Sequence, residues 1–279
     1  MGLPANMATA QTRLSATILL LRDGLERLEV FMVERHHKID FAEGALVFPG
    51  GKVETSDSAP ELAEFCRDTE SGSADDRTLR VAAIRETFEE CGVLLARPRG
   101  EDQLIDGSRL QSISDNHLTA LKNHDLKMAD LVRDEDLELA FDLLVPFAHW
   151  ITPEFMPKRF DTHFFLVAAP ADQLAVHDGY ESVDSLWTTI PRAIELEKSG
   201  QRTIIFPTLE NIKKLGRSQS VGEALENARQ DTIVTVLPKI SKQADGTMMM
   251  ELPEDAGYET IRAPVFPGGK TRPETTASK

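Results

Sequence analysis

Apolar and polar residues along the first part of the chain follow patterns that predict strands leading into an exposed loop. Strands are expected over 15–21 and 28–34, joined by a polar turn over 22–26. A short apolar run over 45–48 then stops at Pro49-Gly50-Gly51, where glycine frees the backbone for unusual angles or close ligand approach. The pattern therefore predicts a strand that presents a backbone loop.

The next segment changes from a polar stretch to a strong helical pattern. Residues 58–80 are polar and acidic, with a short helix expected over 60–67, and we interpret this stretch as an insertion. Residues 79–95 combine strong helix formers with apolar positions at Val81, Ile84 and Phe88. Gly92 is the expected C-cap of this helix.

The remainder of the chain continues the mixture of helices and strands. Helices are expected near 108–121, 131–144, 192–198, 209–215 and 222–229, and strands over 162–168, 202–206 and 232–237. We interpret residues 10–240 as a single domain and 241–279 as a poorly defined C-terminal tail, which from Asp255 onward is expected to be loose or pinned only locally.

Charge and cysteine content narrow the classes of partner. The 279 residues carry a formal net charge of −15, so no general basic surface exists for polymeric nucleic acid or an anionic membrane. A small anionic substrate remains compatible if local cations reverse the field in the site. The two cysteines, Cys66 and Cys91, form neither a disulfide framework nor a thiolate zinc cluster. With no export signal or membrane span recognised, we expect a cytoplasmic protein.

Three glutamates form the candidate chemical centre. Glu86, Glu89 and Glu90 stand at i, i+3 and i+4, so their carboxylates lie on one face of the predicted helix and repel one another. Hard cations such as Mg²⁺ or Mn²⁺ prefer oxygen ligands and bridge carboxylates to phosphates. A bound cation would therefore explain why three carboxylates that repel one another stand together. The alternative is a solvated acidic helix face.

Together with the glycine loop, this helix resembles the Nudix hydrolase signature. That signature runs Gly, five residues, Glu, seven residues, then Arg-Glu-apolar-x-Glu-Glu-x-Gly-apolar, and residues 85–93 match its second half with Thr87 at the first apolar position. Asp57 stands where Glu is usual, and residues 58–84 replace the usual seven. The split box is similar to the Nudix branch that contains the peroxisomal coenzyme A diphosphatases.

The resemblance implies an α/β fold, the α/β/α Nudix sandwich with a mixed β-sheet, a helical insertion inside the box and extra C-terminal helices. It also implies that Arg85 orients a glutamate, that Glu86, Glu89 and Glu90 bind Mg²⁺ or Mn²⁺, and that the Gly50 carbonyl adds a ligand. Family members differ in their general base, which leaves Glu86, Glu89 and a later loop residue, for which Glu181 is the candidate. A solvated turn is the alternative for Glu181.

Other polar residues receive weaker assignments. Lys52 and Arg159 are candidate clamps for substrate phosphates, and an ordinary charge pair with Asp161 is the alternative for Arg159. His36, His37 and His163 show no zinc-site spacing and are interpreted as core or surface residues. A second Val-Phe-Pro-Gly-Gly-Lys, residues 265–270, is not followed by an acidic helix and receives no role.

The expected function is hydrolysis of a diphosphate linkage in a small molecule, with coenzyme A or acyl-coenzyme A as the favoured substrate. The same chemistry on ADP-ribose, a dinucleotide or a nucleotide sugar is the first alternative, and a non-catalytic nucleotide sensor is the second. The resemblance further implies a homodimer. Substrate identity here rests on the branch resemblance alone.

Overall fold

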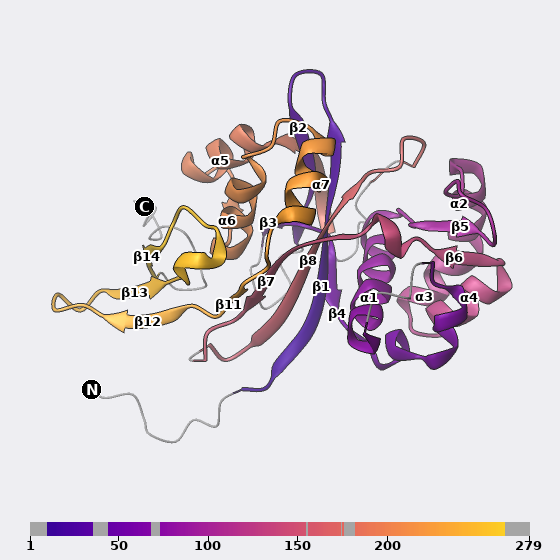
Figure 1. The fold of residues 1–279 in the computed structure, drawn as a ribbon, viewed down its shortest axis with the longest axis horizontal. Coiled ribbons are helices and arrows are strands. Elements are labelled where there is room, and N and C mark those ends of the chain that lie inside the picture. Colours follow the sequence, from indigo (N-terminus) through magenta and orange to yellow (C-terminus); the bar gives the residue numbers. More distant parts are fainter. Residues whose placement is uncertain are drawn as a thin grey trace, which may run out of the picture.

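A mixed β-sheet forms the centre of the computed structural model, which describes residues 10–35, 44–67, 73–154, 156–173, 175 and 182–265 (Figure 1). The long strand β1 (Thr12–Asp23) forms a hairpin with β2 (Leu28–Arg35) and pairs on its other edge, in parallel, with β8 (Arg159–Ala168). Strand β7 (Val145–Ile151) runs antiparallel to β8. The two predicted N-terminal strands are confirmed.

Shorter strands extend this sheet, whose order is β10-β3-β2-β1-β8-β7-β11 in the described part of the chain. Its outer members are β3 (Ala45–Val47), β10 (Thr203–Ile204) and β11 (Thr235–Val236). In addition, β4 (Gly50–Lys52) pairs with β1, and β9 (Ser182–Thr189) pairs with β2. The glycine loop is thus fixed to the central strand.

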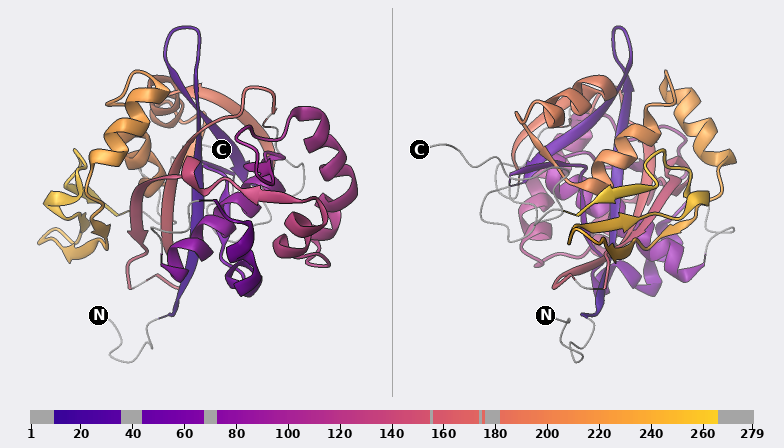
Figure 2. Two further views of the ribbon diagram at one scale, coloured as in Figure 1. Left: turned by 45° about the vertical axis from the view of Figure 1, so that its right-hand side comes forward. Right: turned by 90° about the vertical axis from the view of Figure 1, so that its left-hand side faces the viewer.

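Alternating side chains of β1 face two separate cores, which explains the layers. Ala16, Ile18 and Leu20 belong to the core under helix α1 (Ala74–Cys91), whereas Leu19 and Leu21 belong to the opposite core. Helices α5 (Ile190–Lys198), α6 (Phe206–Leu215) and α7 (Val221–Gln230) cover that second face. Figures 1 and 2 show the sheet between these helical layers, and the predicted α/β/α sandwich is confirmed.

The segment before α1 contains two 3₁₀ helices, Thr55–Ser58 and Pro60–Phe65. Helix α1 begins at Ala74, before the predicted start at 79, because the Ser73 hydroxyl accepts a hydrogen bond from the Asp76 amide and caps the helix. It ends as predicted at Gly92, which has a φ of 67°. Part of the expected insertion is therefore an extension of the acidic helix.

The region after α1 contains strand β5 (Ala96–Pro98), α2 (Gly107–Ile113), a π-helical turn (Ser114–Leu118), α3 (Thr119–Lys122) and α4 (Met128–Asp134). The helix predicted over 131–144 is wrong beyond Asp134. Asp136 adopts a positive φ of 50°, and β6 (Leu137–Leu139) then pairs with β5 before a 3₁₀ turn at Phe141–Leu143. Tertiary pairing outweighs the local helical pattern here.

The described C-terminal residues form a small sheet of β12 (Lys239–Lys242), β13 (Met248–Glu251) and β14 (Arg262–Pro264), with a 3₁₀ turn at Glu254–Ala256. Tyr258 is buried, accepts a hydrogen bond from Trp150 at 2.8 Å and donates one to Asn211 at 2.7 Å. These two hydrogen bonds attach the segment around Tyr258 to the domain. Residues 266–270 of the second Val-Phe-Pro-Gly-Gly-Lys lie outside the described residues.

No described helix is both long and apolar enough to cross a bilayer.

Candidate active site

The glycine loop lies directly against the acidic face of α1. The Gly50 amide donates a hydrogen bond of 2.8 Å to the Glu90 carboxylate, and Gly50 has a φ of 151°, a conformation that favours glycine. A Cβ atom added at Gly51 would lie 2.5 Å from the carboxylate of Glu86. The two glycines therefore let the backbone approach two of the three predicted metal ligands.

Arg85 connects the parts of the box. Its side chain is 3% exposed, and its Nη1 donates to Glu86 at 3.1 Å and to Glu89 at 3.2 Å. Its Nη2 donates to the carbonyl of Lys52 at 2.8 Å. One buried guanidinium thus holds two of the acids and the end of the glycine loop.

Asp57 is the further partner of Arg85. Its two carboxylate oxygens accept bonds of 2.9 Å from Nε and 3.0 Å from Nη2, and its side chain is 1% exposed. The sequence marked Asp57 only as a departure from the usual Glu, and it was not among the predicted site residues. Its position six residues after Gly51 was the signal that pointed to it.

The charges of this cluster perturb one another. Burial opposes the charge on Arg85, but its hydrogen bonds with Asp57 and the charges of Glu86, Asp57 and Glu89 outweigh burial and raise the pKa of the guanidinium. Burial raises the pKa of Glu89 to about 7, although Arg85 acts in the opposite direction. Glu89 is therefore only partly ionised near neutral pH unless a cation stabilises its charge.

The residues present fit a hard divalent cation. Buried Oε1 of Glu89 has no hydrogen-bond partner, an arrangement that is costly without a compensating ligand. Glu86 and Glu89 are 12% and 13% exposed, so their carboxylates remain accessible. The possible ligand atoms of the three glutamates do not all lie within 4.8 Å of one another. Among the described residues, only those of His149, Asp161 and His163 do. Arg85 binds Glu86 and Glu89, whereas the Gly50 amide binds Glu90.

The candidate substrate clamps occupy different settings. Lys52 is exposed beside the box. Arg159 donates from Nε to the Thr152 carbonyl at 3.0 Å and from Nη1 to the Ala10 carbonyl at 3.1 Å, so it ties the start of β8 to neighbouring backbone. Glu181, the loop candidate for the general base, lies outside the described residues, as do His36 and His37.

His163 is not isolated, contrary to what the sequence spacing suggested. The pairing of β7 with β8 places it opposite His149 and near Asp161. Sequence reasoning missed this group because its residues come together across strands rather than at a helical or loop spacing. Alternation along β8, which places Asp161 and His163 on one face, was the available signal.

Comparisons with known proteins agree with this geometry. The family model of the NUDT19 Nudix domain matches residues 64–215. The acyl-coenzyme A diphosphatase NUDT19 of Xenopus laevis is 25% identical over 280 residues, covering 82% of this chain and 71% of that protein. A putative Nudix hydrolase 7 of Caenorhabditis elegans is 30% identical over 165 residues, covering 57% of this chain and 45% of that protein.

A solved structure is also similar. The crystal structure of a Nudix hydrolase from Alicyclobacillus acidocaldarius is 28% identical and superposes with a TM-score of 0.62. The match covers 78% of this chain and 97% of that one. The similarity therefore extends well beyond the box.

Proposed function

The chain belongs to the Nudix hydrolase family described by the NUDT19 Nudix domain, and on this premise we propose that it cleaves the diphosphate linkage of coenzyme A or acyl-coenzyme A. The observation that carries the proposal is the Arg85 network, which joins Asp57, Glu86, Glu89 and the glycine loop in one buried cluster. The name of the Xenopus laevis relative supports the choice of substrate.

In this proposal Glu86, Glu89, Glu90 and the carbonyl of Gly50 hold Mg²⁺ or Mn²⁺, the hard cations that suit oxygen ligands. When bound, the ion supplies charge neutralisation for the diphosphate and lowers the pKa of water. Arg85 orients Glu86 and Glu89 through its Nη1. Gly50 positions Glu90 through its amide.

In this proposal one of three carboxylates is the general base. Glu89 is the first candidate, because its buried Oε1 has no hydrogen-bond partner among the described residues and is available to accept a proton. Glu86 lies beside it on the same helix, and Glu181 is the candidate from a later segment. The chosen base removes a proton from water, whose oxygen attacks one phosphorus atom, and the other phosphate departs as a phosphomonoester.

Lys52 and Arg159 are proposed to bind substrate phosphates. Lys52 is better placed by its exposure beside the box, because two backbone carbonyls already engage Arg159. We also propose a homodimer, following the family resemblance. A reducing, cytoplasmic setting is proposed from the two free cysteines, Cys66 and Cys91.

A substrate panel tests the proposal directly. The protein is incubated with Mg²⁺ or Mn²⁺ and coenzyme A, acetyl-coenzyme A, ADP-ribose, NADH or a diadenosine polyphosphate, and the products are identified. We expect phosphopantetheine and adenosine 3′,5′-bisphosphate from coenzyme A, no turnover with a chelator, and recovery on adding the metal. Preferred cleavage of ADP-ribose or a dinucleotide would make that compound the substrate in place of coenzyme A. If none of the compounds is cleaved, the alternative of a non-catalytic nucleotide sensor is favoured.

A further inference from the structure

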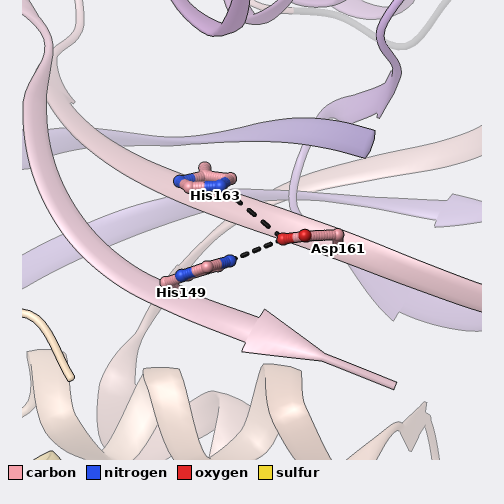
Figure 3. A group of neighbouring side chains, drawn as sticks. All are labelled: His149, Asp161 and His163. Carbon is pink, nitrogen blue, oxygen red and sulfur yellow. Dashed lines mark hydrogen bonds and ion pairs between the residues drawn. The ribbon is translucent and has the colours of Figure 1, made fainter. Parts of the chain in front are cut away.

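Two histidines and an aspartate form a compact group on the sheet, outside the Nudix box. His149 lies on β7, and Asp161 and His163 lie on β8, where His149 and His163 are directly paired (Figure 3). Residues two apart on a strand point to the same face, so Asp161 and His163 both face His149. Figure 3 shows the three side chains turned toward one another.

The distances between the ligand atoms suit a metal ion. Nε2 of His149 lies 2.5 Å and Nε2 of His163 lies 3.6 Å from Oδ1 of Asp161. A tetrahedral site with bonds of 2.0–2.1 Å separates its ligands by about 3.4 Å. The contact of His163 already has that spacing, and the contact of His149 needs to open by about 1 Å. Because the planes of the two rings are inclined by only 21°, binding also requires the rings to turn so that both Nε2 atoms face one ion.

Thr235 fixes the orientation of one ring. Its hydroxyl lies 2.8 Å from Nδ1 of His149, and the pairing of β11 with β7 places the two residues opposite each other. A metal-binding histidine characteristically uses its second ring nitrogen for such a hydrogen bond, which leaves the first free to bind. Nε2 of His149 is therefore directed at Asp161 by a neighbouring strand.

The surrounding charges favour a cation and a neutral ring. The two imidazoles stack with centroids 3.9 Å apart and planes inclined by 21°, so two protonated rings would repel each other. Burial, followed by His149, lowers the pKa of His163, while Asp161 and Asp76 act in the opposite direction. Neutral imidazole is the form that binds metals, and Asp161 supplies the balancing negative charge.

We propose that His149, Asp161 and His163 form a binding site for a divalent transition-metal ion that accepts imidazole ligands, Zn²⁺ above all. Two nitrogens and one carboxylate oxygen supply three positions, and water supplies the fourth. The side chains are 17%, 26% and 30% exposed respectively, so an ion from solution can reach them.

This site is separate from the Nudix metal site. Strand pairing forms a row in which Gly51 opposes Ala16 and Ala16 opposes His163. Two strand spacings place the backbone of His163 about 10 Å from that of Gly51. None of the three residues is a predicted ligand of the Nudix ion, so the proposed ion has a ligand set of its own. The proposal does not depend on the proposed function.

Zn²⁺ titration of the full chain tests the site by calorimetry. His163→Gln and Asp161→Asn are each expected to weaken one class of Zn²⁺ binding by at least about tenfold. His117→Gln is the matched control, because His117 also contacts a carboxylate, Glu135 at 2.8 Å, but is not part of a three-ligand group in the described residues. Glu90→Gln should retain this class of binding, since it alters only the Nudix box.

Unchanged Zn²⁺ affinity in both site variants would overturn the proposal and leave a histidine–aspartate hydrogen bond only. Thermal melts check that the variants fold. Should they not, the test uses the unaltered protein and follows its histidine ring nitrogens by NMR during the titration. Shifts of Nε2 in both His149 and His163 are expected, and their absence would contradict the site.

Discussion

Arg85 and Asp57 form a two-pronged ion pair across 28 residues of sequence, with bonds of 2.9 and 3.0 Å. This contact rejoins a Nudix box that the intervening segment divides. A shorter carboxylate stands where Glu is usual in the signature, yet it reaches Arg85 with both oxygens. The division of the box therefore leaves its charge network intact.

Removing the charge of Asp57 should destabilise the fold. Asp57→Asn is expected to lower the free energy of unfolding by about 3 kcal/mol, because it leaves a buried guanidinium short of one partner. Urea unfolding measures the change. Asp130→Asn is the control, since Asp130 pairs with Arg133 at 3.0 Å on the surface, where the two side chains are 41% and 49% exposed, and it should cost about 1 kcal/mol or less. Equal losses would contradict the buried role of Asp57.

Glu90→Gln should lower turnover of the accepted diphosphate substrate by at least about two orders of magnitude, since it removes one charge from the proposed metal site and no core contact. The thermal midpoint should remain nearly unchanged, because the glutamine oxygen still accepts from the Gly50 amide. Steady-state kinetics with Mn²⁺ provide the measurement. Glu226→Gln, on the exposed face of α7, is the control, and similar activity in both variants would remove Glu90 from the site.

Gly51→Ala should reduce activity more than stability. The added Cβ would lie 2.5 Å from the Glu86 carboxylate, so that side chain must move away from its place beside Arg85. We expect a loss of activity of at least about tenfold, as misplacement of a site group by 1 Å can cost more than this. Gly222→Ala is the control, because a Cβ there meets no atom within 4 Å. Full activity of Gly51→Ala would contradict the close approach of the Gly51 backbone to the Glu86 carboxylate.

Stability should fall in alkaline solution because of Cys66. Burial raises the pKa of its thiol from 9.0 to about 12, with Arg77 acting weakly the other way. Above pH 9 the unfolded chain loses this proton while the folded chain keeps it, so the contribution present below pH 9 is lost between pH 9 and about 12. Urea midpoints from pH 8 to 10.5 should decline more steeply for the unaltered protein than for Cys66→Ala. Parallel curves would refute the shift.

Tyr258→Phe should lower the free energy of unfolding by about 1–3 kcal/mol, because it leaves buried Trp150 without its acceptor and Asn211 without its donor. Thermal and urea unfolding measure the effect. Activity with saturating substrate should be unchanged, since the residue packs on the face of the sheet opposite α1. An unaltered stability would mean that the C-terminal segment adds little to the domain.

The residues of the box could be predicted because they depend on short spacings, whereas the layered fold was expected from the family resemblance. Glu86, Glu89 and Glu90 share one helix, and the alternation in β1 fixes which residues face each layer. The end of the helix was also predictable, because Gly92 permits the left-handed conformation that closes it.

Features that depend on distant partners could not be predicted. The chain after Asp134 forms a strand because β5 is available to pair with it, which no local pattern reveals. Tyr258 is held by Trp150, 108 residues away in sequence. His149 and His163 meet only after the register of two strands is known.

The parallel pairing of β1 with β8 has a consequence for synthesis on the ribosome. Thr12 pairs with Arg159, so the strand leaves the exit tunnel on the order of ten seconds before its neighbour at ordinary elongation rates. During that interval one edge of a strongly apolar strand has no native partner, although β2 and β4 can already occupy the other. A nascent chain stalled before residue 159 should therefore bind chaperones. Chains long enough for β8 to leave the tunnel should bind them less.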